Sequence, residues 1–474
     1  MSQRIQRLLI PLVFPNGISP GEQAVGNHLF IARDGKKRPV LRGTALAGAL
    51  RHEWVQLTNE LLDASEDWFG CALHENKEEG ATSPLRIPDC LLQIGEDNSA
   101  QVRTHIAMDR HRGSVIKGGL FSLETLPPGT RTSVCLYLYV PEGKSEEAKQ
   151  FLSELVLLFE RGMTLGGNAA RGVGDAKLAG NVLWQEFNAK NPEQQGALLD
   201  EQYKWRNGEL PTTGAPLTAA MIDTADFLRV DLVLGIPPGE DLLVGDGQGM
   251  DYEMEPQRVR CADGAEHWRL PGSTLRGAIR GWMTRLAARD GKTVADSVER
   301  HQERQDEGVT LKGQKIAWGF METDQRKQIQ NNLAADPDSL AKEVPCPIMR
   351  LFGSGFSKGR IHVSDAVTNE PLSQASEQLR AHVGIDRITA GANEGFFFQN
   401  TVLKGDVKFP LSITIKNPEE HEVQWLYSAL RAIDLGIVRI GSSKASGRLA
   451  VVRTPVVKGK YSEKMSGFKM SEVK

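Results

Sequence analysis

A twelve-residue pattern that occurs twice constrains the fold of this chain more than any other feature. Residues 40–51 read Val-Leu-Arg-Gly-Thr-Ala-Leu-Ala-Gly-Ala-Leu-Arg, and residues 269–280 read Arg-Leu-Pro-Gly-Ser-Thr-Leu-Arg-Gly-Ala-Ile-Arg. Four positions coincide without a gap: Gly43, Leu46, Gly48 and Arg51 align with Gly272, Leu275, Gly277 and Arg280. Such a repeat indicates a duplicated structural unit, so we expect two copies of one domain within the 474 residues.

Three further landmarks follow in the same order in each half. Trp-Phe-Gly at 68–70 corresponds to Leu-Phe-Gly at 351–353, Asp109-Arg110 to Asp386-Arg387, and the glycine-rich run 166–172 to 441–447. The distance from the Asp-Arg pair to the last glycine is 63 residues in the first half and 61 in the second. The distance from the first glycine to that pair is 66 residues against 114, so we place an insertion in the second half at about 290–345.

The expected secondary structure also agrees between the halves. Each half opens with an apolar strand, at 4–14 and 227–234, and each repeated glycine precedes an amphipathic helix, at 44–63 and 273–289. A second helix begins at Ser145 in one half and at Asn417 in the other, and ends before Gly162 and Gly436. This order predicts an α+β chain of two tandem ferredoxin-like (RRM-like) domains with hairpin and loop insertions. We expect domains at 1–184 and 224–474, joined by a polar linker at 185–223.

Composition excludes some classes of protein and restricts others. The five cysteines (Cys71, Cys90, Cys135, Cys261 and Cys346) are scattered, which favours reduced thiols in the cytoplasm and argues against disulfides or a zinc site. No apolar run approaches the roughly 20 residues that span a bilayer, so we expect no membrane partner. We interpret the N-terminus as a first strand and not as a signal peptide. The net charge of −3 means that any RNA-binding surface must concentrate its basic residues locally.

The repeated glycines precede helices, where free backbone N–H groups and the helix dipole can bind phosphate. Arg51 follows Gly43 along the first helix. Along the second, Gly272 is followed by Ser273, Arg276 and Arg280. A plain helix start with a solvated basic face is the alternative, but its recurrence in both halves favours a site for the phosphodiester backbone.

The glycine-rich loops 166–174 and 441–447 permit a sharp turn and a close approach to a ligand. Arg171, Lys444 and Arg448 add positive charge nearby. These loops match neither a dinucleotide fingerprint nor a P-loop. A simple helix-to-strand turn explains them equally well.

The segments after Asp109-Arg110 and Asp386-Arg387 mix glycines with apolar residues. Such a sequence is typical of a projecting hairpin that inserts apolar side chains between bases. In the alternative interpretation the segments are ordinary hairpins, and phenylalanines such as those at 396–398 belong to the core.

These motifs together resemble the signature set of the RAMP superfamily, and most closely the repeating backbone subunits of type III CRISPR complexes. The resemblance covers both halves, is weaker in the first, and leaves the linker and the insertion unexplained. It implies a fused double subunit, similar to those of the type III-D group, that binds guide RNA (crRNA) and complementary target RNA. It also implies other RAMP subunits and a large subunit as partners, and RNA contacts at the Asp-Arg pairs.

The resemblance further implies a cleaving aspartate in the loop before the Pro-Gly-Ser motif. In the second half this loop contains Asp246 and Asp251, with Glu253 and Glu255 nearby, and Asp251 matches the family pattern best. These carboxylates could hold Mg²⁺ or Mn²⁺, or orient the 2′-hydroxyl for in-line attack. The first-half loop has His28 at about this place and no aspartate, so we expect one active site, in the second half.

Three other functions stay open from the sequence alone. The chain could be a non-cleaving scaffold of the same complex, in which the acidic loop only turns the backbone. It could be a stand-alone RAMP endonuclease that trims precursor guide RNA. An unrelated small-molecule enzyme is the third alternative, because the net charge is close to neutral.

Overall fold

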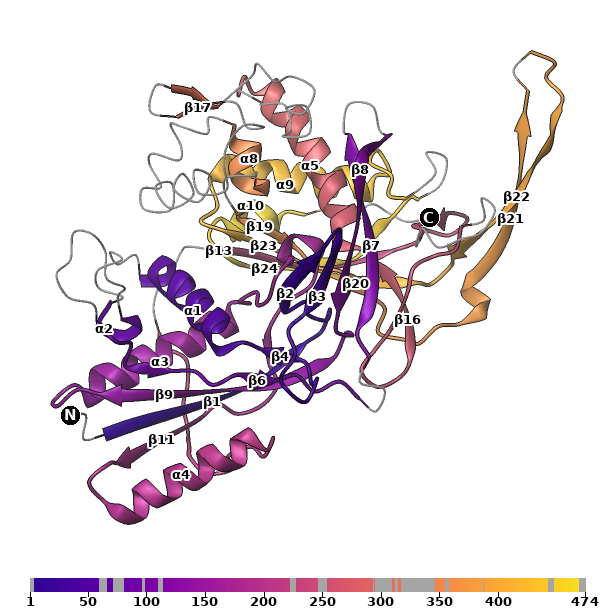
Figure 1. The fold of residues 1–474 in the computed structure, drawn as a ribbon. Helices are drawn as coiled ribbons and strands as arrows, with labels where there is room; N and C mark the ends of the chain where they lie inside the picture. The colour runs from indigo at the N-terminus through magenta and orange to yellow at the C-terminus, as the bar shows by residue number, and fades with distance from the viewer. Residues whose placement is uncertain are drawn as a thin grey trace.

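Two antiparallel sheets with the same strand order lie at the centres of two units (Figure 1). The first sheet consists of β11 (Leu183–Asn188), β1 (Arg4–Phe14), β9 (Thr130–Val140) and β5 (Leu85–Arg86), with β12 (Ala215–Pro216) and β10 (Lys177–Leu178) at its β11 side. The second consists of β24 (Ala450–Gly459), β13 (Phe227–Gly235), β23 (Lys408–Lys416) and β19 (Ile361–Val363). In chain order both read fourth, first, third, second, which confirms the predicted tandem ferredoxin-like fold.

This computed structural model describes residues 4–58, 66–70, 81–95, 99–109, 114–221, 227–245, 254–292, 294, 309–311, 314–316, 346–353, 358–386, 388–441 and 447–468. We call 4–221 the first unit and 227–468 the second unit. Five residues of the predicted site lie outside the described residues: Arg110, Asp246, Asp251, Arg387 and Lys444.

Two helices cover one face of each sheet and close a hydrophobic core. They are α1 (Gly43–Thr58) and α3 (Ser145–Glu160) in the first unit, and α5 (Gly272–Arg289) and α9 (Glu420–Asp434) in the second. Strand β13 shows why the layers form, since Leu228, Val230 and Leu232 alternate with half-buried residues and face the core. The four helices begin where the repeated motifs predict, although α9 starts with a capping box of Glu419 and Glu422 just after Asn417.

The segment predicted as a linker differs from that expectation. Within 185–223, β11 pairs with β1, and α4 (Pro192–Arg206) packs on β11. Its Leu198 and Trp205 belong to the first core, and Arg7 of β1 forms a buried ion pair with Glu201, 2.6 Å apart. Most of this polar stretch is therefore part of the first unit, because it covers the second face of the first sheet.

Each unit also carries a long β-hairpin, as predicted. In the first unit β7 (Gln101–Asp109) and β8 (Ser114–Thr125) pair beside β3 (His28–Ile31) and β2 (Gly21–Val25). In the second, β21 (Glu377–Ile385) and β22 (Ala392–Lys404) pair beside β14 (Asp241–Leu242). We call these the first hairpin (101–125) and the second hairpin (377–404). The second hairpin extends well away from the body (Figure 1).

The remaining elements are short. They are β4 (Val40–Leu41), β6 (Cys90–Leu91), β15 (Arg258–Arg260), β16 (Glu266–Leu270), β20 (Ala366–Val367), α2 (Glu66–Phe69), α8 (Pro347–Phe352), α10 (Ser462–Ser466) and the 3₁₀ turns η1 (Ala169–Arg171) and η4 (Gln374–Ser376). Strands β17 (Val309–Leu311) and β18 (Gln314–Ile316) lie in the predicted insertion. No helix in the described parts of the chain is both long and apolar enough to cross a bilayer.

The four described cysteines, Cys90, Cys135, Cys261 and Cys346, are free thiols in the structure. Burial raises the pKa of Cys90 and of Cys135 to about 12, so both thiols stay protonated at neutral pH.

Candidate nucleic-acid interface

An aspartate caps the first helix of each unit in the same way. The backbone N–H of Gly43 donates to Asp89 Oδ1 at 2.9 Å, and the N–H of Gly272 donates to Asp365 Oδ1 at 2.8 Å. Asp89 lies in Ile-Pro-Asp-Cys and Asp365 in Val-Ser-Asp-Ala, a further repeated landmark that sequence reasoning missed. This first N–H of each helix is thus already occupied, which differs from the predicted phosphate seat.

The repeated glycines are required by close packing. A Cβ at Gly43 would lie 1.9 Å from the carbonyl oxygen of Ile87, and one at Gly272 would lie 2.4 Å from that of Val363. The backbone just before each capping aspartate therefore runs directly against the start of the helix. The glycines permit this close approach of the backbone.

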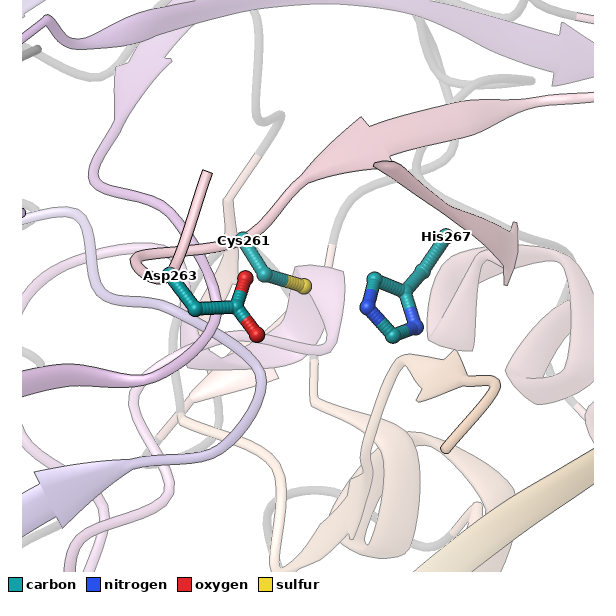
Figure 2. A group of neighbouring side chains, drawn as sticks. All are labelled: Cys261, Asp263 and His267. Carbon is teal, nitrogen blue, oxygen red and sulfur yellow. The ribbon is translucent and has the colours of Figure 1, made fainter. Parts of the chain in front are cut away.

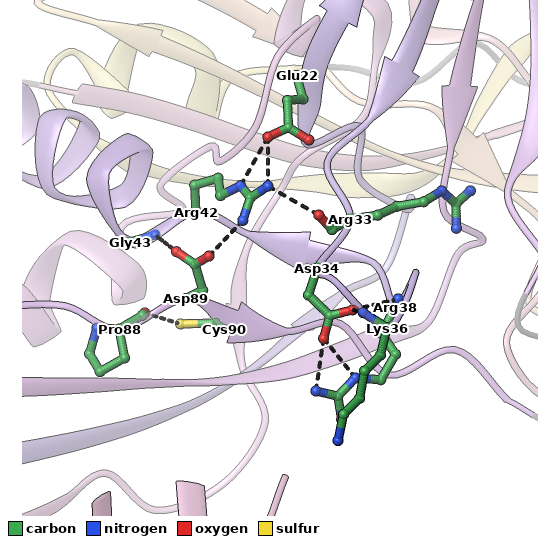
Figure 3. Close-up of polar contacts among 10 residues, drawn as sticks. All are labelled: Glu22, Arg33, Asp34, Lys36, Arg38, Arg42, Gly43, Pro88, Asp89 and Cys90. Carbon is green, nitrogen blue, oxygen red and sulfur yellow. Dashed lines mark hydrogen bonds and ion pairs between the residues drawn. The ribbon is translucent and has the colours of Figure 1, made fainter. Parts of the chain in front are cut away.

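The second oxygen of each aspartate pairs with an arginine from a different source. Asp89 Oδ2 lies 2.8 Å from Nη1 of Arg42, whose guanidinium also binds Glu22 (Figure 3). In the second unit Pro271 takes the place of Arg42, and Asp365 pairs with Arg103 of the first hairpin. Asp89 therefore pairs with an arginine of its own unit, whereas Asp365 of the second unit pairs with an arginine of the first unit.

The predicted basic face of α5 turns onto α8. Arg276 donates to the carbonyl oxygen of Phe352, and the guanidinium carbons of Arg276 and Arg280 lie 5.2 and 5.7 Å from the centre of its ring. Both arginines thus have a packing role in addition to any contact with RNA. Arg51, at the position of Arg280 in α1, is half-buried, and Ser273 is half-exposed.

The two hairpins correspond residue by residue near their bases. His105 stacks on Phe121 with ring centres 5.4 Å apart, and His382 stacks on Phe398 at 5.0 Å, both pairs at an interplanar angle of 16°. The same offset in residue number relates His105 to His382, Phe121 to Phe398, and Arg103 to Arg380. Sequence reasoning missed this correspondence, because it compared only the segments beyond the Asp-Arg pairs.

The first glycine-rich loop joins the first hairpin to the second unit. The carbonyl of Gly172 accepts a hydrogen bond from the N–H of Asp365 at 2.7 Å, and η1 packs against α5 and β19. The guanidinium carbon of Arg171 lies 4.4 Å from the centre of the Phe121 ring, on which His105 also stacks. We call Arg103, His105, Phe121, Arg171 and Asp365 the junction cluster.

Positive charge and burial control the electrostatics of the junction cluster. Burial, followed by the charges of Arg171, Arg103 and Arg269, lowers the pKa of His105 to about 3, so its imidazole is neutral at pH 7. Burial also lowers the pKa of Arg171 from its ordinary value. Among the described residues, no carboxylate pairs with Arg171.

The outer parts of the hairpins expose apolar side chains. Ile106 and Leu120 are exposed on the first hairpin, and on the second the exposed set is Val383, Ile385, Ile388 and Phe397; Val102 and Leu379, at the bases of the hairpins, are exposed as well. At the tip of the second hairpin Asp386 accepts hydrogen bonds from the N–H groups of Ile388 and Thr389, both at 2.8 Å. These bonds, with that from the Thr389 hydroxyl, lower the pKa of Asp386, which here shapes the turn. Asp109 ends β7, opposite Ser114.

The acidic loop is anchored at the base of the second hairpin. Gly245 pairs with Pro256, and Met254 pairs with Asn400 of β22. The N–H of Met254 donates to Asn400 Oδ1 at 3.0 Å, and its carbonyl accepts from the N–H of Thr401 at 3.0 Å. Asp246 follows the first anchor directly in sequence and Asp251 closely precedes the second.

His28 occupies the related place in the first unit. Leu29 pairs in parallel with Leu123 of the first hairpin, and Met254 pairs in parallel with Asn400 of the second. Leu123 and Asn400 occupy equivalent positions in the two hairpins, so Leu29 is the counterpart of Met254. His28 lies one residue before Leu29, and its Nδ1 is 2.6 Å from Ser122 Oγ. A strand residue bonded to the hairpin thus occupies the place where the second unit has its acidic loop.

Comparison with known protein families agrees with this repeated architecture. The sequence model of the RAMP superfamily matches residues 8–177 and again residues 258–448, together more than half of the chain. This chain belongs to the RAMP superfamily. The two matches fall one on each unit, so the protein is a fused double RAMP, as the sequence predicts. A search among curated proteins found no match.

Membership of the RAMP superfamily indicates that this protein binds RNA. RAMP proteins are CRISPR-associated RNA-binding subunits, so both RAMP units belong to an RNA-binding protein. The first match includes Gly43, Asp89, the first hairpin and the first glycine-rich loop, and the second includes their counterparts. The predicted landmarks and the capping aspartates therefore lie within the RAMP units themselves.

Proposed function

We propose that this protein is a guide-RNA-binding backbone subunit of a type III CRISPR complex, and that the guide RNA crosses the junction cluster. The observation that carries the proposal is the position of Arg171. Its guanidinium lies on Phe121 between the first hairpin and α5, with no described carboxylate as partner. An arginine held by an aromatic ring, with its charge available, is suited to contact a phosphate.

Each RAMP unit contributes a hairpin whose role fits a paired RNA. Exposed apolar side chains such as Ile388 and Phe397 are costly in water unless they contact another molecule. Inserted between base pairs, they would interrupt the guide–target duplex at intervals set by the two hairpins. The junction cluster would thus contact the phosphates of the guide RNA, and the hairpins would set the distance between interruptions of the duplex.

The protein also offers a place for another RAMP subunit. Arg380 and His382 of the second hairpin correspond to Arg103 and His105, which in the first hairpin contribute to a junction with a following unit. We propose that the second hairpin contacts a further RAMP subunit of the complex, beside the large subunit and the target RNA. We propose the cytoplasm as the compartment, as the reduced thiols suggest.

We further propose that the second unit cleaves the target RNA. The ends of its acidic loop are bonded to the base of the second hairpin, the element that we propose interrupts the duplex. Asp251 and Asp246 offer hard oxygen donors, which suit Mg²⁺ or Mn²⁺, and such an ion would supply electrostatic stabilisation of the cleaved phosphate. Glu255, in an ion pair with Arg258, has a separate partner.

The test of this proposal is cleavage of a complementary RNA by the reconstituted complex. Asp251→Ala should remove one cleavage position, with a loss in rate on the order of 10²-fold or more, and chelation should do the same. His28→Ala, the matched variant in the first unit, should change no cleavage position. If Asp251→Ala cleaves normally, Asp246→Ala is the next variant. If both cleave normally, this chain is a non-cleaving scaffold.

A further inference from the structure

Three metal-binding side chains meet at the turn between β15 and β16, a place that the proposed RNA contacts do not use. Cys261, Asp263 and His267 each offer one ligand atom, and these atoms lie within 4.8 Å of one another. Figure 2 shows the sulfur of Cys261 between the carboxylate and the imidazole, with one ring nitrogen facing the sulfur. Sequence reasoning dismissed a zinc site because no close cysteine or histidine pair was visible.

The imidazole of His267 is fixed in the form that binds metal. It is buried, and its Nδ1 lies 2.7 Å from the carbonyl oxygen of Thr368. A carbonyl can only accept, so Nδ1 carries a proton, and in the neutral ring the lone pair is on Nε2. Metal-binding histidines commonly have such a second partner, because it sets both the tautomer and the orientation of the ring.

The turn holds the other two side chains in place. The N–H of Cys261 donates to the carbonyl of Ala265 at 2.8 Å, which closes the turn. One carboxylate oxygen of Asp263 accepts from the N–H of Ala265 at 3.0 Å, which orients the carboxylate without using its second oxygen. Burial, and then the charge of Asp263, raises the pKa of Cys261 to about 11, so the thiol is protonated until a cation displaces the proton.

The donor set selects the kind of ion. A thiolate and an imidazole favour zinc and similar transition ions over Mg²⁺ or Ca²⁺. Zinc binds sulfur at about 2.3 Å and nitrogen or oxygen at about 2.0–2.2 Å, so side-chain adjustments on the order of one ångström would bring these atoms around one ion. We propose that Cys261, Asp263 and His267 bind one Zn²⁺-type ion, with water as the fourth ligand.

The three residues lie at a contact between the two RAMP units. All three residues line a cleft of about 940 Å³ between the two units, from which an ion can enter. The same turn contacts the first unit, since the N–H of Ala262 donates to the carbonyl of Pro128 at 2.8 Å. The carbonyl of Ala262 lies so close to Gly95 that a Cβ there would be 2.0 Å away. A bound ion would therefore rigidify a contact between the two RAMP units.

Titration of the full-length, RNA-free protein with Co²⁺ and then Zn²⁺ tests the proposal independently of any role in RNA binding or cleavage. We expect one equivalent of Co²⁺, a thiolate-to-Co²⁺ charge-transfer band, and loss of that band when Zn²⁺ displaces Co²⁺. Cys261→Ser should abolish the band. A wild-type protein without the band, or a Cys261→Ser variant that retains it, would contradict the proposal.

Two further variants keep the test valid if Cys261→Ser folds poorly. Asp263→Asn preserves an oxygen that can accept from Ala265, so the turn should persist while Zn²⁺ affinity falls. Loss of an outer-shell partner costs roughly 10- to 100-fold in affinity, and loss of a direct ligand should cost at least as much. His52→Ala, an exposed histidine on α1, is the matched control and should leave affinity unchanged. Equal affinities for Asp263→Asn and His52→Ala would overturn the assignment.

Discussion

Arg103 of the first unit and Asp365 of the second form an ion pair that is almost completely removed from solvent, with side chains 5% and 0% exposed. The same carboxylate caps α5 through the N–H of Gly272, and the N–H of Asp365 donates to Gly172. One residue thus connects the first hairpin, the first glycine-rich loop and the start of the helix in the second unit. Both RAMP units contribute to one surface because of this arrangement.

Breaking this pair should destabilise the protein strongly. Arg103→Ala leaves a buried, uncompensated carboxylate, and removing one partner of a buried ion pair commonly costs about 3–5 kcal/mol. Arg4→Ala is the control, since Arg4 pairs with Glu186 at an exposed position where a salt bridge contributes at most about 1 kcal/mol. Urea denaturation measures both. Equal losses for the two variants would show that the junction does not depend on Arg103.

The repeated glycines provide a matched comparison within each helix. Gly43→Ala and Gly272→Ala place a methyl group against a carbonyl oxygen and should cost at least about 1–3 kcal/mol. Gly48→Ala and Gly277→Ala meet no neighbour within 4 Å, and alanine should stabilise these helix interiors by up to about 1 kcal/mol. Thermal unfolding of the four variants gives the comparison. If Gly48→Ala lowered the stability as much as Gly43→Ala, the packing role of Gly43 would be contradicted.

His105 should make the stability of the protein sensitive to acid. Its pKa is about 3 in the folded protein and 6.5 in the unfolded chain. Above pH 6.5 the imidazole is neutral in both states and has no effect. Below that pH the unfolded chain binds a proton that the folded protein rejects, so stability falls by about 1.4 kcal/mol per pH unit until the folded pKa is approached.

His105→Phe keeps an aromatic ring on Phe121 and removes the titration. Between pH 7.5 and pH 5.5 the wild-type protein should therefore lose about 1.4 kcal/mol more stability than the variant. Urea denaturation at the two pH values measures the difference, and contributions from other groups are common to both proteins. Identical losses would mean that His105 has the same pKa in the folded protein as in the unfolded chain.

The tip of the second hairpin should set the spacing of cleavage. Deleting residues 388–394 removes Ile388, whose side chain is 94% exposed, and leaves the stacked pair of His382 and Phe398. The complex should still assemble, while the cleavage position on a complementary RNA shifts or disappears. Gel analysis of the products checks this. Unchanged positions would assign the hairpin a structural role only.

The sequence alone predicted the duplication, the α+β class and the helices that follow Gly43 and Gly272. It did not distinguish a helix start that binds phosphate from one that binds an aspartate, because the glycine is the same in both cases. Asp89 and Asp365 lie far along the chain from the glycines they contact, and a four-residue similarity is too short to stand out. They could be recognised only after the fold had brought them to the helix.

Local composition explains the other differences. The segment 185–223 is polar because α4 buries only Leu198 and Trp205, so it resembles a linker although it covers a sheet. Cys261 and His267 are six positions apart, a spacing that becomes a cluster only when a tight turn reverses the chain between them. The roles of Asp246 and Asp251 stay a prediction.

The salt dependence of guide-RNA binding tests the central claim, that the RNA crosses the junction cluster at Arg171. Each phosphate contact on single-stranded RNA contributes about 0.7 to the slope of log affinity against log salt concentration. Arg171→Gln should therefore weaken binding and lower the slope by about this amount, with melting temperature measured as a control. Arg276→Ala/Arg280→Ala, whose arginines pack on Phe352, should change the slope less. An unchanged slope in Arg171→Gln, with a reduced slope in the double variant, would place the RNA along α5 and contradict the account.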